Sequence, residues 1–556
     1  MNIELKKIDL SKFYYNNLYR DYIFNFDKIK NYYQYDFRRI DSYKKRFEDI
    51  SLNYNHSLRP KVSGILKKYN GSLGCSRKTI ENIDALEDSK SAVVIGGQQP
   101  GLLTGPIFII YKILTVLKVS SFLENKLNRK IVPCFWNASD DSNPRQVNNL
   151  TILNKNLENI TLDLTGVKKG VKYSRMYLKT DVFKRVINDL SNVIKPTDFK
   201  GTAVDFLNEC LSAAADSSTA EDSSTSISYF FSVIISRMFS DYGLVVVDPA
   251  VRELKSLSRS LLNYDIDNHK KISSTVNYVG DKLKENGYHS QINSQTETLN
   301  FFLDLKGVRE KITEVKKGYF AAGNKRFTKE ELIKYIEKNI KDISLNVIMR
   351  PLFQDSVLPV MCCICGPGET SYFSQLKKIY GLAGVRLPII YPRFSATIIE
   401  KRIKKVLDRF EISDTDLQLD REKLTRKIIE RRLNLNLDEL MAGFKNDTGE
   451  LIKRFEKNIS NYGMNIFSSF DRIKRNIKKE TSILEKKLYS EYKKQNGYVA
   501  GSSDKVYQSI FPNDNLQERE LSIWGFINKY GFDFTYSLYL ELKPLSFSHK
   551  FIEISE

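Results

Sequence analysis

Apolar residues in this 556-residue chain follow two different periods. In the first part, short apolar runs alternate with segments of helical length: 93–96 is followed by 106–126 and then by 131–136. Such alternation is typical of βαβ units, in which helices cover both faces of a parallel sheet. The pattern predicts an α/β fold. Further apolar runs, which we expect to complete a discontinuous sheet core, lie at 244–248, 346–349, 357–365 and 387–391.

The second period, with apolar residues spaced by threes, fours and sevens, begins near Ala396. One series runs from Ile403 to Ile428 and another from Leu451 to Leu488, both among dense Lys, Arg and Glu. This spacing predicts two long helices that pack along a narrow apolar seam. A break near Asn434–Gly449 would let them fold back as an antiparallel coiled-coil hairpin.

Composition along the chain suggests where the domains begin and end. The first 90 residues are rich in Tyr, Lys and Phe with helical spacing, and a Lys-rich helix follows a strand-like run inside 265–345. We therefore predict a helical N-terminal region (1–90), a parallel-sheet core in two parts (91–264 and 346–399), an inserted subdomain over the mouth of the sheet (265–345), a coiled coil (400–495) and a C-terminal tail that packs on the core (496–556).

The segment Val93–Tyr111, VVIGGQQPGLLTGPIFIIY, combines a short strand, a loop of Gly, Pro and Gln, and the start of a helix. Backbone N–H groups and the positive end of the helix dipole at such a junction suit a phosphate or carboxylate. A plain tight turn is the alternative, because glycine-rich loops are common. The candidates for substrate or nucleotide binding in this loop are Gly97, Gln98, Gln99, Gly101, Thr104 and Gly105.

Two adjacent carboxylates, Asp140 and Asp141, come just after the run 131–136. The carboxyl ends of parallel strands meet at one edge of a sheet, so these side chains should lie near the first loop. Adjacent carboxylates can bind a metal, hold a substrate ammonium or act as a base.

The motif Gly366-Pro367-Gly368-Glu369 repeats the strand, loop and helix arrangement after the run 357–365. Two such loops at one sheet edge are what a nucleotide-binding crevice requires. A capped helix with ordinary surface polar residues, and a structural salt bridge for each arginine, are the alternatives. The candidates from this half of the chain are Gly366, Gly368, Glu369, Tyr372, Gln375, Arg350, Gln354 and Arg393.

Composition and charge limit the kinds of binding partner and the cellular location that we expect. The formal charge of +20 comes without an Arg-rich tail or an aromatic RNA-binding signature, which favours attraction of small anions over nucleic acid. The N-terminus lacks an apolar signal-peptide core, and the longest apolar stretch contains Lys112 and Lys118, so we expect a soluble cytoplasmic protein without a membrane span. No metal site is predicted, because Cys362, Cys363 and Cys365 alternate with apolar residues and lack complementary Cys or His ligands.

Several of these segments, in this order, resemble the bacillithiol biosynthesis cysteine-adding enzymes, the cysteine ligase BshC family. The loop around GQQPGLLTGP resembles the family's glycine-rich loop, and VPCFWNASDD resembles its Phe-Trp strand and acidic cluster. GLVVVDP, MRPLFQDSVLP, GPGETSYFSQLK, PNDNLQERE and NKYG also match the family's pattern. The resemblance spans most of the chain, and it implies a Rossmann-like core with a coiled coil.

The resemblance implies a ligase that joins L-cysteine to glucosaminyl-malate through an amide bond. The amino sugar's nitrogen would attack an activated cysteine carboxyl, so a nucleotide (ATP or ADP) is expected. Asp140, Asp141 and Glu369 are the implied catalytic residues, and the coiled coil is expected to form a homodimer.

This sequence departs from the family where histidines are expected. The family typically has Glu-Asp-His-Asp followed by a second histidine, whereas this chain has Ser142 and Asn149 at the two histidine positions. Neither side chain can transfer protons near neutral pH as histidine does. Either those histidines have a structural or metal-related role in relatives, or this chain is a non-catalytic relative that acts as a coiled-coil dimer or ligand-binding scaffold.

Overall fold

The computed structural model describes residues 2–7, 16–144, 147–216, 223–413, 416–433, 437–461, 467–495 and 497–555. The chain divides into two compact units, each described here by itself. The first comprises Met1–Thr397 and Asn515–Ile552, and the second comprises Ile398–Asp514 and Glu553–Ser555. The second unit therefore ends later than the predicted boundary at 495, because α20 (Gly497–Ile510) packs against α16 (Lys401–Arg409) and α17 (Arg421–Leu433).

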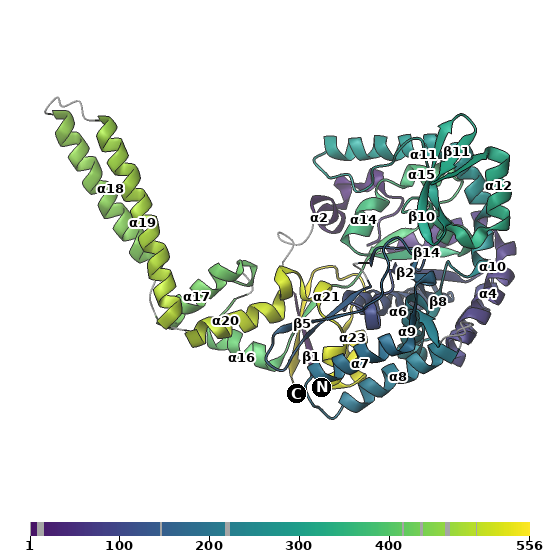
Figure 1. The fold of residues 1–556 in the computed structure, drawn as a ribbon, viewed down its shortest axis with the longest axis horizontal. Coiled ribbons are helices and arrows are strands. Elements are labelled where there is room, and N and C mark those ends of the chain that lie inside the picture. Colours follow the sequence, from purple (N-terminus) through teal and green to yellow (C-terminus); the bar gives the residue numbers. More distant parts are fainter. Residues whose placement is uncertain are drawn as a thin grey trace. The chain divides into compact units, whose positions relative to one another are not determined.

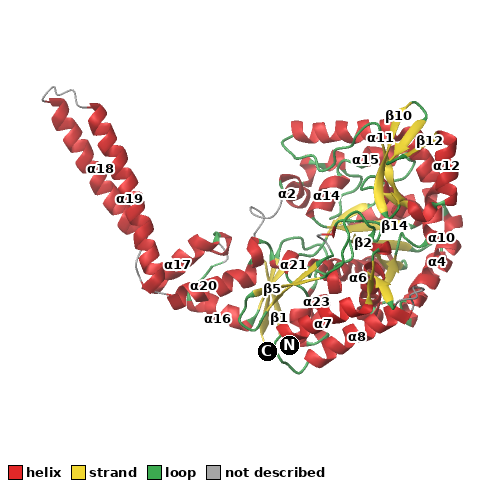
Figure 2. Ribbon diagram, viewed as in Figure 1, coloured by secondary structure: helices red, strands yellow, loops and turns green. Residues whose placement is uncertain are grey.

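The first unit is built around a five-stranded parallel sheet with the order β15-β14-β2-β3-β8. Figure 2 draws its strands in yellow, with β2 and β14 labelled. The strands are β2 (Ala92–Gln98), β3 (Ile131–Asn137), β8 (Val245–Val247), β14 (Val360–Cys365) and β15 (Ile389–Pro392). All of them are apolar and buried along most of their length, as expected of a sheet covered on both faces. The order reverses between β2 and β14, and open α/β sheets bind ligands at such a switch point.

Helices surround this sheet (Figure 1). The apolar stretch after the first loop forms α6 (Phe108–Leu127), which packs against β2 and β3, so it is a buried helix as predicted. Among the described residues no helix is both long and apolar enough to cross a membrane. The other helices before β9 are α2 (Asn17–Phe24), α3 (Ile40–Asn53), α4 (Arg59–Ser72), α5 (Arg77–Asp84), α7 (Thr180–Val193), α8 (Lys200–Asp216), α9 (Ile227–Met238), α10 (Arg252–Lys255) and α11 (Arg259–Glu285).

Residues 298–345 form a separate antiparallel sheet with the order β12-β11-β10-β9-β13. It has its own apolar core, which includes Phe301, Leu303 and Ile312 and packs against α11 and α12 (Lys329–Lys338). The strands are β9 (Thr298–Leu305), β10 (Val308–Lys316), β11 (Tyr319–Ala322), β12 (Lys325–Thr328) and β13 (Ile343–Leu345). This sheet is the body of the predicted insert.

The predicted core strand at 346–349 is wrong. The neighbouring strand β13 belongs to the insert, and Asn346 begins a turn whose side-chain oxygen accepts hydrogen bonds from the backbone of Ile348 (2.9 Å) and Met349 (3.1 Å). That turn starts α13 (Met349–Val357), so local side-chain hydrogen bonding overrides the apolar run.

The remaining elements of the first unit lie before, between and after the strands of the sheet core. Two small antiparallel sheets, β4 with β5 and β6 with β7, precede the insert, and short helices return from residue 515 onward. They are β1 (Asn2–Lys7), β4 (Asn149–Leu153), β5 (Asn159–Asp163), β6 (Tyr177–Lys179), β7 (Ser224–Ser226), α14 (Pro367–Phe373), α15 (Lys377–Leu382), α21 (Gln517–Glu520), α22 (Trp524–Tyr530) and α23 (Asp533–Glu541); β16 (Ala396–Ile399) and β17 (Lys550–Ser555) cross the boundary between units.

The second unit contains the coiled coil, but its long helices differ from the prediction. They are α18 (Leu437–Asn461) and α19 (Phe467–Gln495). Lys445 pairs with Glu485 and Glu456 with Lys474, so the two helices run antiparallel. The predicted break at Asn434–Gly449 is wrong over 437–449, which lie inside α18, and its first residues, 434–436, lie outside the described residues. The predicted seam residues Tyr462 and Ile466 lie outside the described residues.

The first glycine-rich loop depends on close backbone contact. A Cβ at Gly101 would lie 2.6 Å from the Cα of Gly105, which itself has a φ of 69°. The neighbouring Leu103 and Thr104 also have positive φ values, of 45° and 82°. This loop therefore stores backbone strain that only tight packing can maintain.

We predict that Gly101→Ala lowers the free energy of unfolding of the first unit by about 1–3 kcal/mol, because the added methyl group overlaps a backbone atom. Both tryptophans, Trp136 and Trp524, lie in this unit, so their fluorescence during urea unfolding reports on it. Gly64→Ala in α4 is the control, because a Cβ there meets nothing within 4 Å. Equal stability of Gly101→Ala and wild type would contradict the prediction.

Candidate active site

A cavity of about 1070 Å³ opens at the carboxyl ends of β2, β3 and β14, beside the switch point of the sheet. Residues of the sheet core, of the inserted subdomain and of the segment 515–520 line it. We call it the central cavity. Of the residues predicted from the sequence, it is lined by Gly97, Gln98, Gln99, Asp140, Asp141, Arg350, Gly366, Gly368, Glu369, Tyr372 and Arg393.

The two predicted loops meet through a residue that sequence reasoning missed, Lys112 on α6. Its side chain is 1% exposed, and its ammonium donates to the carbonyl of Gly97 (2.7 Å), to Oε1 of Gln98 (3.0 Å) and to Oε2 of Glu369 (2.5 Å). Glu369 also accepts from the backbone N–H of Gly366 (2.7 Å). The signal in the sequence was a lysine within the apolar first half of this helix, FIIYKILTVL, because a buried ammonium must be paired.

A chain of polar contacts leads from these loops to the insert. Gln98 donates to Gln99 (2.7 Å), and Gln99 donates to Oδ2 of Asp141 (2.9 Å). The other oxygen of Asp141 lies 3.4 Å from the guanidinium of Arg309 on β10. This guanidinium stacks over the ring of Phe302. Arg309 was also missed, because only the folded insert brings it to the cavity.

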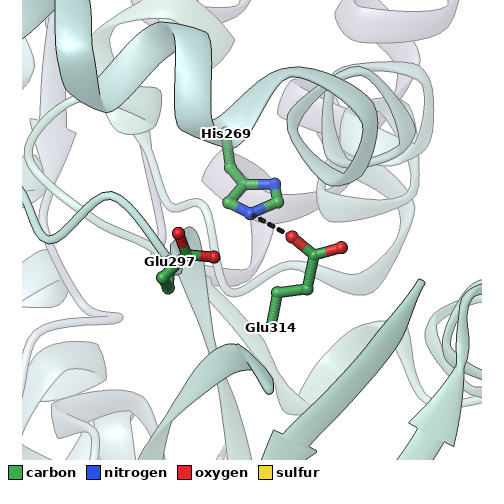
Figure 3. A group of neighbouring side chains, drawn as sticks. All are labelled: His269, Glu297 and Glu314. Carbon is green, nitrogen blue, oxygen red and sulfur yellow. Dashed lines mark ion pairs between the residues drawn. The ribbon is translucent and has the colours of Figure 1, made fainter. Parts of the chain in front are cut away.

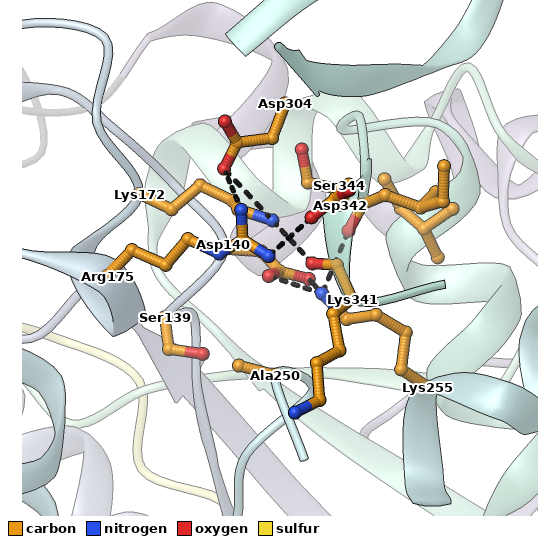
Figure 4. Close-up of polar contacts among 12 residues, drawn as sticks. Ser139, Asp140, Lys172, Arg175, Ala250, Lys255, Asp304, Lys341, Asp342 and Ser344 are labelled. Carbon is orange, nitrogen blue, oxygen red and sulfur yellow. Dashed lines mark hydrogen bonds and ion pairs between the residues drawn. The ribbon is translucent and has the colours of Figure 1, made fainter. Parts of the chain in front are cut away.

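Asp140 belongs to a separate network of buried charges that joins the sheet core to the insert (Figure 4). The ammonium of Lys255 lies 2.6 and 2.8 Å from its two carboxylate oxygens and donates to the carbonyl of Ile343. Burial alone would raise the pKa of Asp140, but Lys255 and Lys172 hold it below its usual value. Asp140 therefore stays ionised and fixed.

Lys172 sits deeper in the same network. It lies 3.7 Å from Asp304, which also pairs with Arg175 at 2.8 Å, and it donates to the carbonyl of Lys341. Burial, together with the positive charge of Lys255, lowers the pKa of Lys172 to about 8. These contacts attach β9 and the residues before β13 to the sheet core.

Two arginines face the cavity from the second half of the chain. Arg350 donates to the hydroxyl of Tyr372 at 3.1 Å. Arg393 forms a buried two-pronged pair with Glu518 on α21, at 3.1 and 2.5 Å. Glu518 therefore fixes the orientation of the Arg393 guanidinium in the cavity wall.

Several predicted residues do not line the cavity. Gly101, Thr104 and Gly105 face the C-terminal segment: the N–H of Ile107 donates to the carbonyl of Leu521, and the indole of Trp524 donates to the carbonyl of Leu103. This segment covers the loop, so the predicted anion site there is not formed by those residues.

Gln354 and Gln375 are also buried away from the cavity lining. Gln354 donates to Asp355 at 3.0 Å, and Oε1 of Gln375 accepts from the backbones of Gln291 and Ile292, at 2.8 Å each. Both amides hold backbone or neighbouring side chains in place, because a buried amide needs internal partners.

Comparison with known proteins covers both units. Residues 3–394 match the model of the BshC N-terminal Rossmann-like domain, and residues 396–554 match that of the BshC C-terminal coiled-coil domain, both of bacillithiol biosynthesis. The chain belongs to the BshC family.

Relatives in this family cover nearly the whole chain. Proteins named "Putative cysteine ligase BshC" from Desulforamulus reducens and Salinibacter ruber are each 27% identical, with 92% of both chains aligned. One of the same name from Bacillus cereus (strain Q1) is 27% identical over 96% of both chains.

Among the described residues that line the central cavity, none is a histidine. Asn149, at one expected histidine position, lines the cavity, and the backbone N–H of Ser142, at the other, donates to Asp141 at 2.8 Å.

We predict that Lys112→Met lowers the free energy of unfolding of the first unit by about 1–3 kcal/mol, because it removes the ammonium that neutralises Glu369 and that donates to the carbonyl of Gly97. In the Glu369→Gln background the loss should be smaller, since the charge to be compensated is gone. The measurement is a double-mutant cycle in urea, followed by tryptophan fluorescence. Additive effects of the two substitutions would show that the pair is not coupled.

Proposed function

We propose that this chain is a ligase that joins the carboxyl group of L-cysteine to the amino group of glucosaminyl-malate. Membership of the BshC family supports the reaction class. The observation that carries the proposal is the central cavity, in which cationic and acidic side chains converge at the switch point of a Rossmann-like sheet. Its volume is at the upper end of ordinary ligand sites, which suits more than one reactant.

The charges around the cavity match those of the proposed substrates. The malate part of the acceptor carries two carboxylates, for which Arg309, Arg350 and Arg393 supply guanidinium groups. The amino groups of both substrates suit the carboxylates of Asp141 and Glu369. The neutral amides of Gln98 and Gln99 link Lys112 to Asp141 and line the cavity, so they would help to fix the orientation of a bound molecule.

A nucleotide is proposed as the source of activation, because amide formation from a free carboxylate is uphill in water. The donors that support it are arginine and lysine side chains of the cavity rather than the two glycine loops. In the second loop the N–H of Gly366 is bound to Glu369, and in the first the N–H of Gly105 donates to Leu102. Phosphate groups would therefore meet side-chain cations at the cavity wall.

A non-catalytic role is the second candidate, and Ser142 and Asn149 favour it. A scaffold would keep its coiled coil but would have no need for a charged cavity that holds Lys112 and Glu369 in register. The contacts of these residues therefore support the ligase.

We predict that Asp141→Asn lowers the rate of bacillithiol formation about 10²–10³-fold, because it removes a positioned charge and keeps the volume. The substrates are glucosaminyl-malate, cysteine and ATP, supplied to the purified chain or, in cells, to a strain without its own enzyme. Asp163→Asn, at an exposed position on β5, is the control and should leave the rate unchanged.

Two results would contradict this assignment in different ways. No product from the folded wild-type chain, with any nucleotide, would refute the ligase and leave the scaffold. Equal product from wild type and Asp141→Asn would keep the ligase and remove Asp141 from its site.

We propose further that the chain is a homodimer through α18 and α19. Large apolar side chains on these two helices are 41–58% exposed, more than two helices leave uncovered when their seam is complete. They are Leu440, Phe444, Leu451, Phe455, Ile473 and Leu484.

The wild-type chain should sediment as a dimer at micromolar concentration, and Leu451→Glu with Leu484→Glu should convert it to a monomer, because burying these charges costs more than the contact returns. Lys478→Glu, a charge reversal at an exposed position of α19, should remain a dimer. A wild-type monomer would refute the dimer without affecting the proposed reaction.

A further inference from the structure

A second group of chemically capable side chains lies in the inserted subdomain, outside the central cavity (Figure 3). It consists of His269 on α11, Glu297 just before β9, and Glu314 on β10. One ligand atom from each lies within 4.8 Å of the others. The residues come from three separate segments, and folding of the insert brings them together.

The imidazole of His269 is oriented for metal binding. Its side chain is 5% exposed, and Nδ1 lies 3.2 Å from the carbonyl of Ile266, which can only accept, so Nδ1 carries the proton. Nε2 is left as the ligand atom that faces the cluster. It is buried, makes no hydrogen bond and points at Oε2 of Glu314, 3.4 Å away. A buried polar atom without a hydrogen bond, aimed at a carboxylate, suits a cation shared between the two groups.

The carboxylate of Glu314 is also oriented by a backbone hydrogen bond. Its Oε1 accepts from the backbone N–H of Gly318 at 2.8 Å, which leaves Oε2 for the cluster. The separation of 3.4 Å between Nε2 and Oε2 equals the ligand spacing of about 3.4 Å expected in a tetrahedral site with bonds of about 2.1 Å. Glu297 is half-exposed and can move the remaining distance.

Lys270 supplies the positive charge in this structure. Its ammonium lies 2.6 Å from Glu297 and 2.8 Å from Glu314. The side chain is 48% exposed, so it can turn into solvent and leave both carboxylates to another cation. A backbone carbonyl behind the histidine and a hydrogen-bonded carboxylate are the outer contacts that metal ligands usually have.

We propose that His269, Glu297 and Glu314 bind a divalent transition metal ion of the zinc type, in competition with the ammonium of Lys270. A nitrogen ligand with two carboxylates suits Zn²⁺ or Co²⁺ better than Mg²⁺ or Ca²⁺, which prefer oxygen alone. The ion would join α11 to β9 and β10, the strands that carry Phe302 and Arg309 to the central cavity. Its role is to brace the insert, separate from the proposed reaction.

Titration of the untagged, metal-free full chain with Co²⁺, followed by absorbance, tests the proposal. We expect one equivalent to bind, with the visible bands of a cobalt site made of nitrogen and oxygen and without a sulfur-to-cobalt charge-transfer band. Glu297→Gln should weaken binding at least about 10-fold, and His269→Gln should abolish it. Lys270→Ala should strengthen binding, because the competing ammonium is removed.

Matched controls exclude surface effects. Glu337→Gln on α12 and His289→Gln change an exposed acid and an exposed histidine of the same region and should bind Co²⁺ as wild type does. Glu297 and Lys270 are both half-exposed, so their variants keep the test valid if His269→Gln fails to fold. No saturable binding to wild type, or equal affinity in Glu297→Gln, would overturn the site. Equal affinity in Lys270→Ala would overturn the competition.

Discussion

The arrangement of the candidate active site depends on one buried ammonium, that of Lys112. A charge with 1% exposure costs several kcal/mol unless all of its donors are satisfied. Lysine has three donors, and the three acceptors are the carbonyl of Gly97, the side chain of Gln98 and the carboxylate of Glu369. Gly97 and Gln98 end β2, and Glu369 lies just after β14, so the acceptors come from two strands that are neighbours in the sheet and more than 250 residues apart in the sequence. The lysine thus couples both halves of the core at the switch point.

The contacts that begin at Lys112 continue into the inserted subdomain. Gln98, held by Lys112, donates to Gln99, which donates to Asp141, whose other oxygen faces Arg309. A second set of contacts, from Asp140 through Lys255 to the carbonyl of Ile343, runs alongside it. The insert is therefore joined to the sheet by charges that also form the cavity wall. A shift of the insert would change the cavity, because these are the same atoms.

The sequence predicted the parts of this structure that depend on local pattern. Alternating strands and helices, the two glycine-rich loops, and most of the polar residues that follow the strands were found, because burial and turn chemistry leave periodic marks. Ion pairs and hydrogen bonds between residues far apart in the sequence produce no periodic pattern that could reveal them. Lys112 could be read only as an interruption of an apolar helix, and Arg309 as one charge among many on a strand.

The wrong predictions also concern features that local sequence patterns do not determine. Apolar heptad spacing does not distinguish one long helix from two, so it could not show where one long helix ends, and the predicted break at Asn434–Gly449 covers residues that lie inside α18. Gly101, Thr104 and Gly105 were assigned to a ligand because the sequence cannot reveal that residues 521–524, at the other end of the chain, cover them.

Among the described residues the cavity has no histidine, so in the proposed reaction a carboxylate would have to take up the proton of the attacking amine. Asp140 is unsuited to accept a proton, since both of its oxygens face the ammonium of Lys255 and its pKa is held low. Glu369 is bound by Lys112 and by the backbone of Gly366. Asp141 differs: its oxygens accept from the neutral amide of Gln99 and the backbone N–H of Ser142, and the nearest guanidinium is 3.4 Å away. Its side chain is 34% exposed, against 24% for Glu369 and 14% for Asp140. For the proposed reaction, Asp141 is therefore the carboxylate of these three that is most open to a substrate amino group.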